Sequence, residues 1–323
     1  MSAAGPPDDG KGTGRLRAAG RRPVGTRPPA GGGGAERRFG EEHASGADVG
    51  PEELRDAPLG HPTGYPDAYA PALLYALPRA PQREALGIAG ALPFQGVDLW
   101  TAYELTWLDR RGKPMVAMAT FDIPAQSPCI VESKSMKLYL GSFAQTRFDE
   151  PGEVTVALTH DLSKAVGSTV RVVLDRPERF AGVRLHELEG TSLDALDAEC
   201  AAYDVDATLL AARGDKVAET LTTNLFRSVC PVTGQPDIAS VAIGYEGPQI
   251  DRAALLRYLV SYRCHAGFHE HCVERIFVDV LTQCRTQWLS VYARFLRRGG
   301  IDINPFRSNV GTRPPVGVRT ARQ

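Results

Sequence analysis

Residues 97–107 read VDLWTAYELTW, and the odd positions of this stretch hold apolar residues, aromatic residues or threonine. The polar residues Asp98, Glu104 and Thr106 lie between them. A period of two residues is typical of a half-buried β-strand. The following residues, 109–114 (DRRGKP), have the composition of a turn, and 115–123 reads as a returning strand. The stretch therefore predicts an antiparallel hairpin.

Helical patterns follow this hairpin in the first half of the chain. Residues 132–143 place Met136, Tyr139, Leu140 and Phe143 three and four positions apart, which predicts one amphipathic helix. A second helix is predicted over 153–166 and a strand over 170–174. The first half thus reads as a hairpin, two helices and a strand.

The second half repeats this order without visible sequence identity. Strands are predicted at 222–229 and 238–245, on either side of a loop. Asp251 is placed to cap a helix, a second helix begins near residue 268, and 289–295 reads as a strand. The repeated order predicts an α+β fold, in which an antiparallel sheet carries helices on one face.

Length and composition suggest how the chain is divided. At 323 residues, the chain is long enough for about two domains. Residues 1–50 hold 13 of the 33 glycines and a single aromatic residue, Phe39, so we expect a disordered Gly/Pro-rich tail. The predicted domains are an N-terminal one over 51–190 and a C-terminal one over 191–323.

Charge and cysteine usage limit the class of protein. The 37 Lys and Arg nearly balance the 38 Asp and Glu, which argues against nucleic acid or a membrane surface as a partner. The sequence has no apolar run of about 18 residues and no apolar leader, so we expect neither a membrane span nor secretion. The six cysteines form no CxxC pair, which fits free thiols in a cytoplasmic location.

The loop between the two later strands contains the first candidate for chemistry. Residues 230–237 read CPVTGQPD, and Cys230 lies in a polar loop where a thiol can be reached. If the loop folds back, the carboxyl group of Asp237 can approach the same substrate atom. The alternative is a small structural thiol near an aspartate that caps a turn, and the loop alone favours that alternative.

The second candidate is the start of the last predicted helix. His269 and Glu270 lie where exposed backbone amides favour a carboxylate. A metal site could combine His265 and His269 with His271 or Cys272. However, His269 and His271 point apart on a helix, so we predict no metal. A plain polar helix start is the simpler interpretation of the spacing.

Two further segments carry charges that can contact a ligand. Residues 132–134 (ESK) open the first predicted helix, where Glu132 could bind a heterocycle and Lys134 a phosphate. Arg298 and Gly299 form a basic turn, in which glycine allows close approach of the backbone. The alternatives are a solvated helix end and an ordinary turn.

Taken together, these segments resemble one family. Residues 132–139 (ESKSMKLY), 230–237 (CPVTGQPD), 268–270 (FHE) and 298–305 (RGGIDINP) are similar, in order, to motifs of the NADPH-dependent 7-cyano-7-deazaguanine reductases. These enzymes are the nitrile reductases of queuosine biosynthesis. The resemblance spans about 60–323 and is to the long form. It implies two tandem tunnelling-fold (ferredoxin-like) domains, a homodimer and a cytoplasmic location.

The resemblance also implies a mechanism and a set of site residues. The nitrile of 7-cyano-7-deazaguanine would be reduced to the amine through a covalent thioimide on Cys230, with NADPH as the reductant. The implied catalytic residues are Cys230, Asp237 and His269. The implied substrate-binding residues are Val131, Glu132, Ser133, His269 and Glu270. The implied NADPH-binding residues are Ser133, Lys134, Arg298 and Gly299.

Two other functions remain open at this point. One is a zinc-dependent pterin or GTP cyclohydrolase-like hydrolase of the same fold, which would need a His/Cys metal set. The other is a non-catalytic purine-binding protein that keeps the fold. The joint presence of Cys230, Asp237, His269 and the two glutamates favours the reductase.

Overall fold

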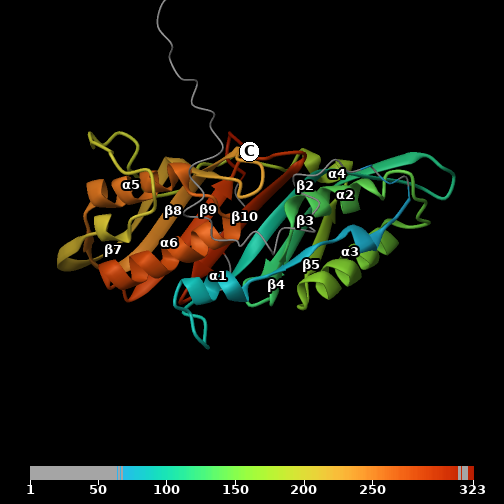
Figure 1. Ribbon diagram of the computed structural model, residues 1–323. Coiled ribbons are helices and arrows are strands. Elements are labelled where there is room, and N and C mark those ends of the chain that lie inside the picture. The colour runs from blue at the N-terminus through green and yellow to red at the C-terminus, as the bar shows by residue number, and fades with distance from the viewer. Residues whose placement is uncertain (1–63, 65, 67, 312–313, 315–318) are drawn as a thin grey trace, which may run out of the picture. The chain divides into compact units, whose positions relative to one another are not determined.

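The computed structural model describes residues 64, 66, 68–311, 314 and 319–323. The predicted tail over 1–50 lies outside the described residues. The described part contains an eight-stranded sheet and a separate two-stranded sheet, with helices packed on the larger one (Figure 1). The α+β class predicted from the sequence is therefore confirmed.

All neighbouring strands of the larger sheet are antiparallel except the pair of β6 and β7. In spatial order its strands are β5 (Arg171–Asp175), β3 (Pro114–Pro124), β2 (Gln95–Leu108), β10 (Ile301–Ser308), β9 (Trp288–Phe295), β8 (Pro236–Ile250), β7 (Ala212–Val229) and β6 (Thr191–Ser192). The smaller sheet pairs β1 (Ala76–Pro78) with β4 (Cys129–Val131). Each half of the chain thus contributes strands to one continuous sheet.

The principal helices lie on one face of this sheet. The helices are α1 (Ala80–Ala85), α2 (Ser133–Gly141), α3 (Pro151–Val166), α4 (Pro177–Phe180), α5 (Arg252–Ser261) and α6 (His269–Cys284), with 3-10 turns at Pro71–Leu73, Ala207–Leu209 and Tyr262–Cys264. On β10, Ile301 and Ile303 pack in the core that contains α2 and α3, and Arg307 on the same face bonds to Glu274 of α6. The predicted one-sided packing of helices is confirmed.

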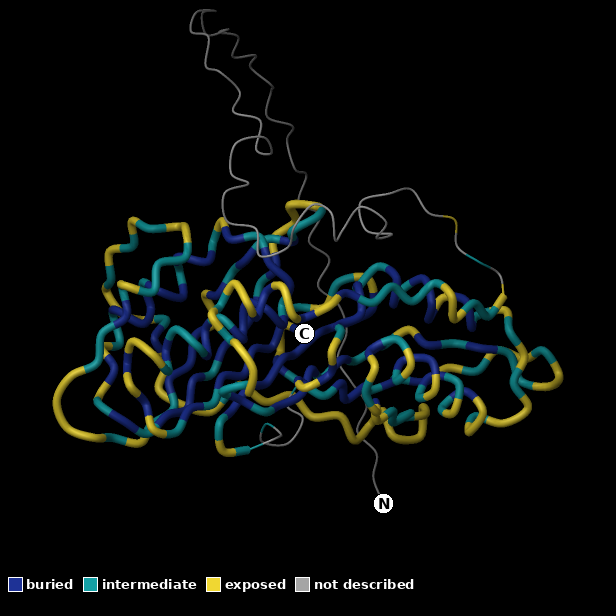
Figure 2. Tube along the Cα trace, turned by 60° about the horizontal axis from the view of Figure 1, so that its bottom comes forward, coloured by how far each residue is buried: buried dark blue, intermediate teal, exposed yellow. Residues whose placement is uncertain are grey.

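Two apolar cores lie beneath the helices, one for each half. The first is built from β2, β3, α2 and α3, and the last strand, β10, adds Ile301 and Ile303 to it. The second is built from β8, β9, α5 and α6. Figure 2 shows the buried stretches along the central strands of both halves. The two cores match the tandem arrangement, and β10 joins them because it pairs with both β2 and β9.

The hairpin that opens the fold is confirmed, but the predicted buried face is wrong for its first part. Trp100 faces the helical core, whereas Val97 lies in a small cluster on the opposite face with Tyr292 and Phe306. The pairing of β2 with β3 shifts between Ala102 and Leu105. A bulge of this kind moves the following side chains to the other face, so the simple alternation fails there.

The predicted helices and strands otherwise agree with the structure. Asp251 caps α5 by accepting a hydrogen bond from the Ala254 amide at 2.9 Å. Strands β7 and β8 are longer than predicted, and strand β10 is not predicted at all. Proline is uncommon within a strand, and β10 contains Pro305. Its pairing with β9 begins only at Phe306, so Pro305 lies outside that ladder.

Candidate functional site

Cys230 is the first residue of the loop between β7 and β8, and Asp237 lies just after this loop, at the start of β8. The Cys230 amide donates to the Gln235 carbonyl at 2.8 Å, and the Gly234 amide donates to the Cys230 carbonyl at 3.1 Å. Gly234 has φ +66, a left-handed conformation that favours glycine. These bonds close the loop into a fixed turn, so Cys230 and Asp237 are held at neighbouring ends of one hairpin.

The thiol of Cys230 is less exposed than its loop position suggests. The residue is 5% exposed, and the preceding Val229 pairs with the segment that leads into α6, with bonds to His265 and Gly267. Cys230 belongs to none of the apolar clusters formed by the described residues. Its surroundings include polar groups, because the charge of Lys137 interacts with it. The thiol is buried, but it lies beside charged side chains.

The carboxylate of Asp237 is held between the guanidinium group of Arg298 and the imidazole ring of His269. Its Oδ1 lies 2.7 Å from an Arg298 guanidinium nitrogen and 3.3 Å from His269 Nε2. Burial alone would raise the pKa of Asp237, but the bond to His269 and the charges of His269, Arg298 and Lys137 lower it overall. The ionised form of Asp237 is therefore favoured in the resting protein.

His269 and Glu270 form the first turn of α6, as predicted. The His269 ring stacks on Phe295, with centroids 3.7 Å apart, and this contact fixes the imidazole over Asp237. Among the described residues His269 Nδ1 has no hydrogen-bond partner. Glu270 is 2% exposed. Burial and repulsion from Asp98 raise the pKa of Glu270 to about 7, against the charges of His269 and Arg79.

Glu132 caps α2 with its side chain. Its carboxylate accepts the Lys134 amide at 2.5 Å and the Ser135 amide at 2.8 Å. Burial raises the pKa of Glu132, and the two amides and the charge of Lys137 oppose this rise. A carboxylate has about four acceptor positions, so capping leaves some for a ligand.

The other predicted residues of this segment lie beside Glu132. The Val131 side chain packs in the N-terminal core, so its backbone is the part that could face a ligand. Within the described residues, the hydroxyl of Ser133 bonds only to Glu132, at 3.5 Å. Lys134 occupies the first turn of α2. The structure thus keeps Glu132, Ser133 and Lys134 together at one helix start.

The turn between β9 and β10 brings Arg298 and Gly299 to the hairpin loop. Besides Asp237, Arg298 contacts the Gln235 side-chain oxygen at 2.7 Å. Gly299 has φ +58, and a Cβ at this position would lie 3.2 Å from the side-chain carbons of Lys137. Cationic groups and a glycine turn suit a phosphate-bearing cofactor, so Arg298 and Gly299 fit their predicted role.

Three residues near the site are absent from the sequence-based set. Gln235 orients Arg298, Phe295 supports His269, and Lys137 interacts with the charges of Glu132, Cys230 and Asp237. Burial and the charge of Arg298 lower the pKa of Lys137. Its spacing three residues after Lys134, on the same helix face, is a signal that could have identified it.

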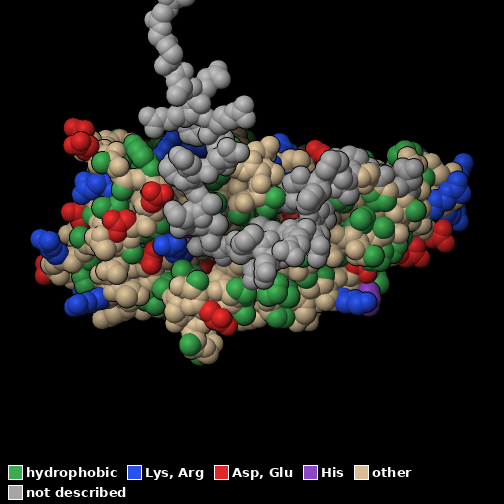
Figure 3. All heavy atoms as spheres, viewed as in Figure 1, with side chains coloured by type: hydrophobic (Ala, Val, Ile, Leu, Met, Phe, Trp, Pro, Cys, Tyr) green, Lys and Arg blue, Asp and Glu red, His purple; other side chains and the backbone are tan. Residues whose placement is uncertain are grey.

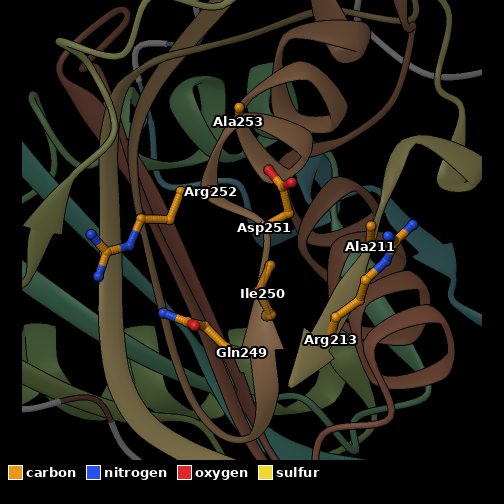
Figure 4. Close-up of a pocket in the computed structure, with 7 residues that line it drawn as sticks. All are labelled: Ala211, Arg213, Gln249, Ile250, Asp251, Arg252 and Ala253. Carbon is orange, nitrogen blue, oxygen red and sulfur yellow. The ribbon is translucent and has the colours of Figure 1, made fainter. Parts of the chain in front are cut away.

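Other features of the described residues lie apart from this site. A hollow of about 560 Å³ at the start of α5 contains none of the predicted residues, and Arg213 and Arg252 point to different sides of it (Figure 4). On the face drawn in Figure 3, positive and negative side chains are interspersed. No three potential metal ligands gather within the described ranges. No helix in the same ranges has the length and apolarity to cross a membrane.

Comparison with known proteins points to one family. Residues 65–174 match the family model described as nitrile reductase, 7-cyano-7-deazaguanine-reductase N-term, and 236–313 match the model of QueF-like proteins. The chain is 56% identical to the NADPH-dependent 7-cyano-7-deazaguanine reductase of Burkholderia vietnamiensis, over 83% of this chain and 98% of that protein. It is also 56% identical to the protein of the same name from Bordetella pertussis, over 84% and 99%.

Proposed function

The chain belongs to the family of NADPH-dependent 7-cyano-7-deazaguanine reductases, and from this premise we propose that Cys230 and Asp237 carry its chemistry. The protein is an oxidoreductase of the queuosine pathway that reduces the nitrile of 7-cyano-7-deazaguanine to the primary amine. Its reductant is NADPH. The observation that supports the assignment of residues is the Asp237 carboxylate, held by His269 and Arg298 at the end of the hairpin that begins with Cys230.

The first proposed step is addition of the thiol to the nitrile. The Cys230 sulfur forms a bond to the nitrile carbon, and one π bond of the C≡N group breaks. Asp237 is ionised at rest, so it can take the thiol proton and then deliver it to the nitrile nitrogen. The product is a neutral thioimide, and the proton lost by sulfur is found on nitrogen. Covalent capture divides a difficult reduction into smaller steps.

The chain's other residues position the reacting groups. Glu132 and Glu270 accept hydrogen bonds from the ring N–H groups, which selects a guanine-like edge. His269 closes the pocket and holds Asp237 through Nε2. Ser133, Lys134, Arg298 and Gly299 would hold NADPH, and two NADPH molecules bound in turn would each supply one of the two hydrides that the reduction to the amine requires. The thiolate of Cys230 is released on the way and is regenerated for the next turnover.

The thioimide can be tested by absorption spectroscopy. Mixing the protein with 7-cyano-7-deazaguanine, without NADPH, should produce a new near-ultraviolet band. Cys230→Ala should abolish the band, whereas Cys264→Ala, which changes an exposed thiol, should retain it. A band of full intensity in Cys230→Ala would reject the covalent mechanism. Activity that is lost on chelation of zinc would favour the cyclohydrolase-like alternative.

The oligomeric state and the location of the protein are part of the same proposal. We expect a homodimer in the cytoplasm, in line with the resemblance. The six cysteines are all free thiols, which supports a reducing compartment. Native mass spectrometry measures the oligomeric state directly. A monomer at micromolar concentration would contradict the dimer.

A further inference from the structure

A cluster of buried charges lies where the two halves of the chain meet. Arg79 contacts Asp98 at 2.5 Å, and Arg307 contacts Asp98 at 2.7 Å and Glu274 at 2.8 Å. Arg83 also contacts Glu274 at 2.8 Å. None of these five residues is more than 9% exposed. They lie at the N-cap of α1 and within it (Arg79 and Arg83), on β2 (Asp98), on α6 (Glu274) and on β10 (Arg307). Charges this deep are retained only when they are paired.

The charges of this cluster do not balance without a sixth group. Three guanidinium groups face two carboxylates, which leaves one positive charge. Within the described residues, Nη1 of Arg79 makes no hydrogen bond, and it reaches Glu274 only at 3.6 Å. Glu270 lies one helical turn before Glu274 on α6, and its charge interacts with Arg79. An ionised Glu270 would make the whole group neutral.

The protonation of Glu270 is set by groups on several elements. His269 and Glu274 flank it on α6, Asp98 faces it from β2, Arg79 from the start of α1, and Arg307 lies behind them on β10. Burial and Asp98 raise the pKa of Glu270 to about 7, while His269 and Arg79 oppose the rise. Near neutral pH, therefore, the loss of one neighbouring charge changes the ionised fraction of Glu270.

We propose that Arg79 is a positioning residue for ring recognition, which keeps Glu270 in the carboxylate form that the substrate requires. This rests on the proposed role of Glu270 as a ring anchor. A carboxylate offers only acceptors to the two N–H donors of a guanine-like edge, whereas a protonated carboxyl group presents a donor of its own. Arg79 is in turn fixed by Asp98 and by Ser127, which accepts from Nε at 3.2 Å. The start of α1 thus tunes the pH range of substrate binding.

The pH dependence of KM for the nitrile tests this proposal. In the wild type, KM should rise as the pH falls below about 7, because Glu270 becomes protonated. In Arg79→Gln, the inflection should move up by about one pH unit or more, since a neighbouring positive charge is lost. At alkaline pH, kcat should stay close to wild type. Arg83→Gln is the matched control, because it removes a positive charge from the same cluster at a partner of Glu274, so the inflection should move less than in Arg79→Gln.

Three results would overturn the proposal or separate it from its premise. An inflection in Arg79→Gln that matches Arg83→Gln would show that Arg79 has only a structural role. If Arg79→Gln does not fold, Arg79→Lys provides the second test, because it keeps the positive charge and should leave the inflection near its wild-type position; an inflection that moves up by a pH unit in Arg79→Lys contradicts the proposal. Glu270→Gln tests the premise itself: normal ring binding in that variant would reject Glu270 as the anchor.

Discussion

The hairpins of the two halves occupy the same place in the repeated order, yet only one holds the residues to which we assign chemistry. The turn between β2 and β3 is exposed, and its Asp109 accepts the amides of Arg111 and Lys113. The loop between β7 and β8 buries Cys230 and Asp237 among charges. A repeated scaffold therefore supports different functions according to the side chains in its connections.

The two aspartates show the difference most clearly. The pKa of Asp109 is lowered chiefly by the backbone hydrogen bond from Lys113, in a turn at the surface, where the carboxylate serves the turn itself. The pKa of Asp237 is lowered against the effect of burial, by the side chains of His269, Arg298 and Lys137. Those three residues come from three different elements. Their convergence requires the complete fold, and it marks a site rather than a turn.

The largest expected effect is the loss of the nucleophile. Cys230→Ala should lower kcat by at least about 10³-fold, because the covalent route is removed. Cys264→Ala, at an exposed position, should retain wild-type turnover. The rate of NADPH oxidation with saturating nitrile measures both variants. Turnover within tenfold of wild type in Cys230→Ala would contradict the role of this thiol.

The paired aspartates provide the second prediction. Asp237→Asn should lower kcat by about 10²- to 10⁴-fold with little change in nitrile affinity, since an amide cannot relay the proton. Asp109→Asn, in the corresponding hairpin, should leave kcat and KM unchanged. Steady-state kinetics and equilibrium binding separate the two effects. If Asp237→Asn weakens binding alone, the residue is a ligand contact and not the proton donor.

The junction between the halves should depend on Glu274 for stability. Burial would raise the pKa of Glu274, but Arg307, Arg83 and Arg79 lower it from 4.5 to about 2, which corresponds to about 3 kcal/mol. This stability is present above about pH 4.5 and is lost as the pH falls toward 2. Glu274→Gln should therefore destabilise the protein by about 3 to 5 kcal/mol in urea unfolding at neutral pH.

A buried carboxylate within one half provides the comparison. Asp161 accepts a hydrogen bond from Tyr139 at 2.7 Å and another from Tyr69, both neutral donors. Asp161→Asn should cost less, about 1 to 3 kcal/mol. Equal losses in the two variants would show that the charges at the junction have no special importance.

The smallest effect is expected from two glycines with similar backbones. Gly299 has φ +58 and Gly112 has φ +82, so alanine at either position should cost about 1 to 2 kcal/mol. Gly299→Ala should also raise KM for NADPH about five- to tenfold, because a Cβ would press on Lys137. Gly112→Ala should not change that KM, and an equal effect in both variants would remove Gly299 from the cofactor site.

Local patterns in the sequence predict most of the elements, because each depends on spacing that is visible within a few residues. The hairpin at 97–123 and the cap at Asp251 are of this kind. Strand β10 is different, because it pairs with β2 about 200 residues away and contains Pro305, a residue type that is uncommon within strands. The bulge between Ala102 and Leu105 also has no clear local signal, so the buried face of β2 was predicted wrongly.

The site shows the same limit. Cys230, Asp237, His269 and Arg298 are predicted by motif. The structure brings Asp237, His269 and Arg298 together and places Cys230 at the start of the same hairpin loop. Phe295 lies in a pattern that also suits an ordinary strand, so its place near the site emerges only from the fold. Arg79 has no local pattern that predicts its burial, because its partners Asp98 and Glu274 lie far along the chain.

Mass spectrometry of the protein mixed with 7-cyano-7-deazaguanine, in the absence of NADPH, tests the central claim most directly. The account predicts one added substrate mass per chain, located on the peptide that contains Cys230, and its disappearance when NADPH is supplied. An unmodified Cys230 in a protein that still consumes NADPH with the nitrile would contradict the account.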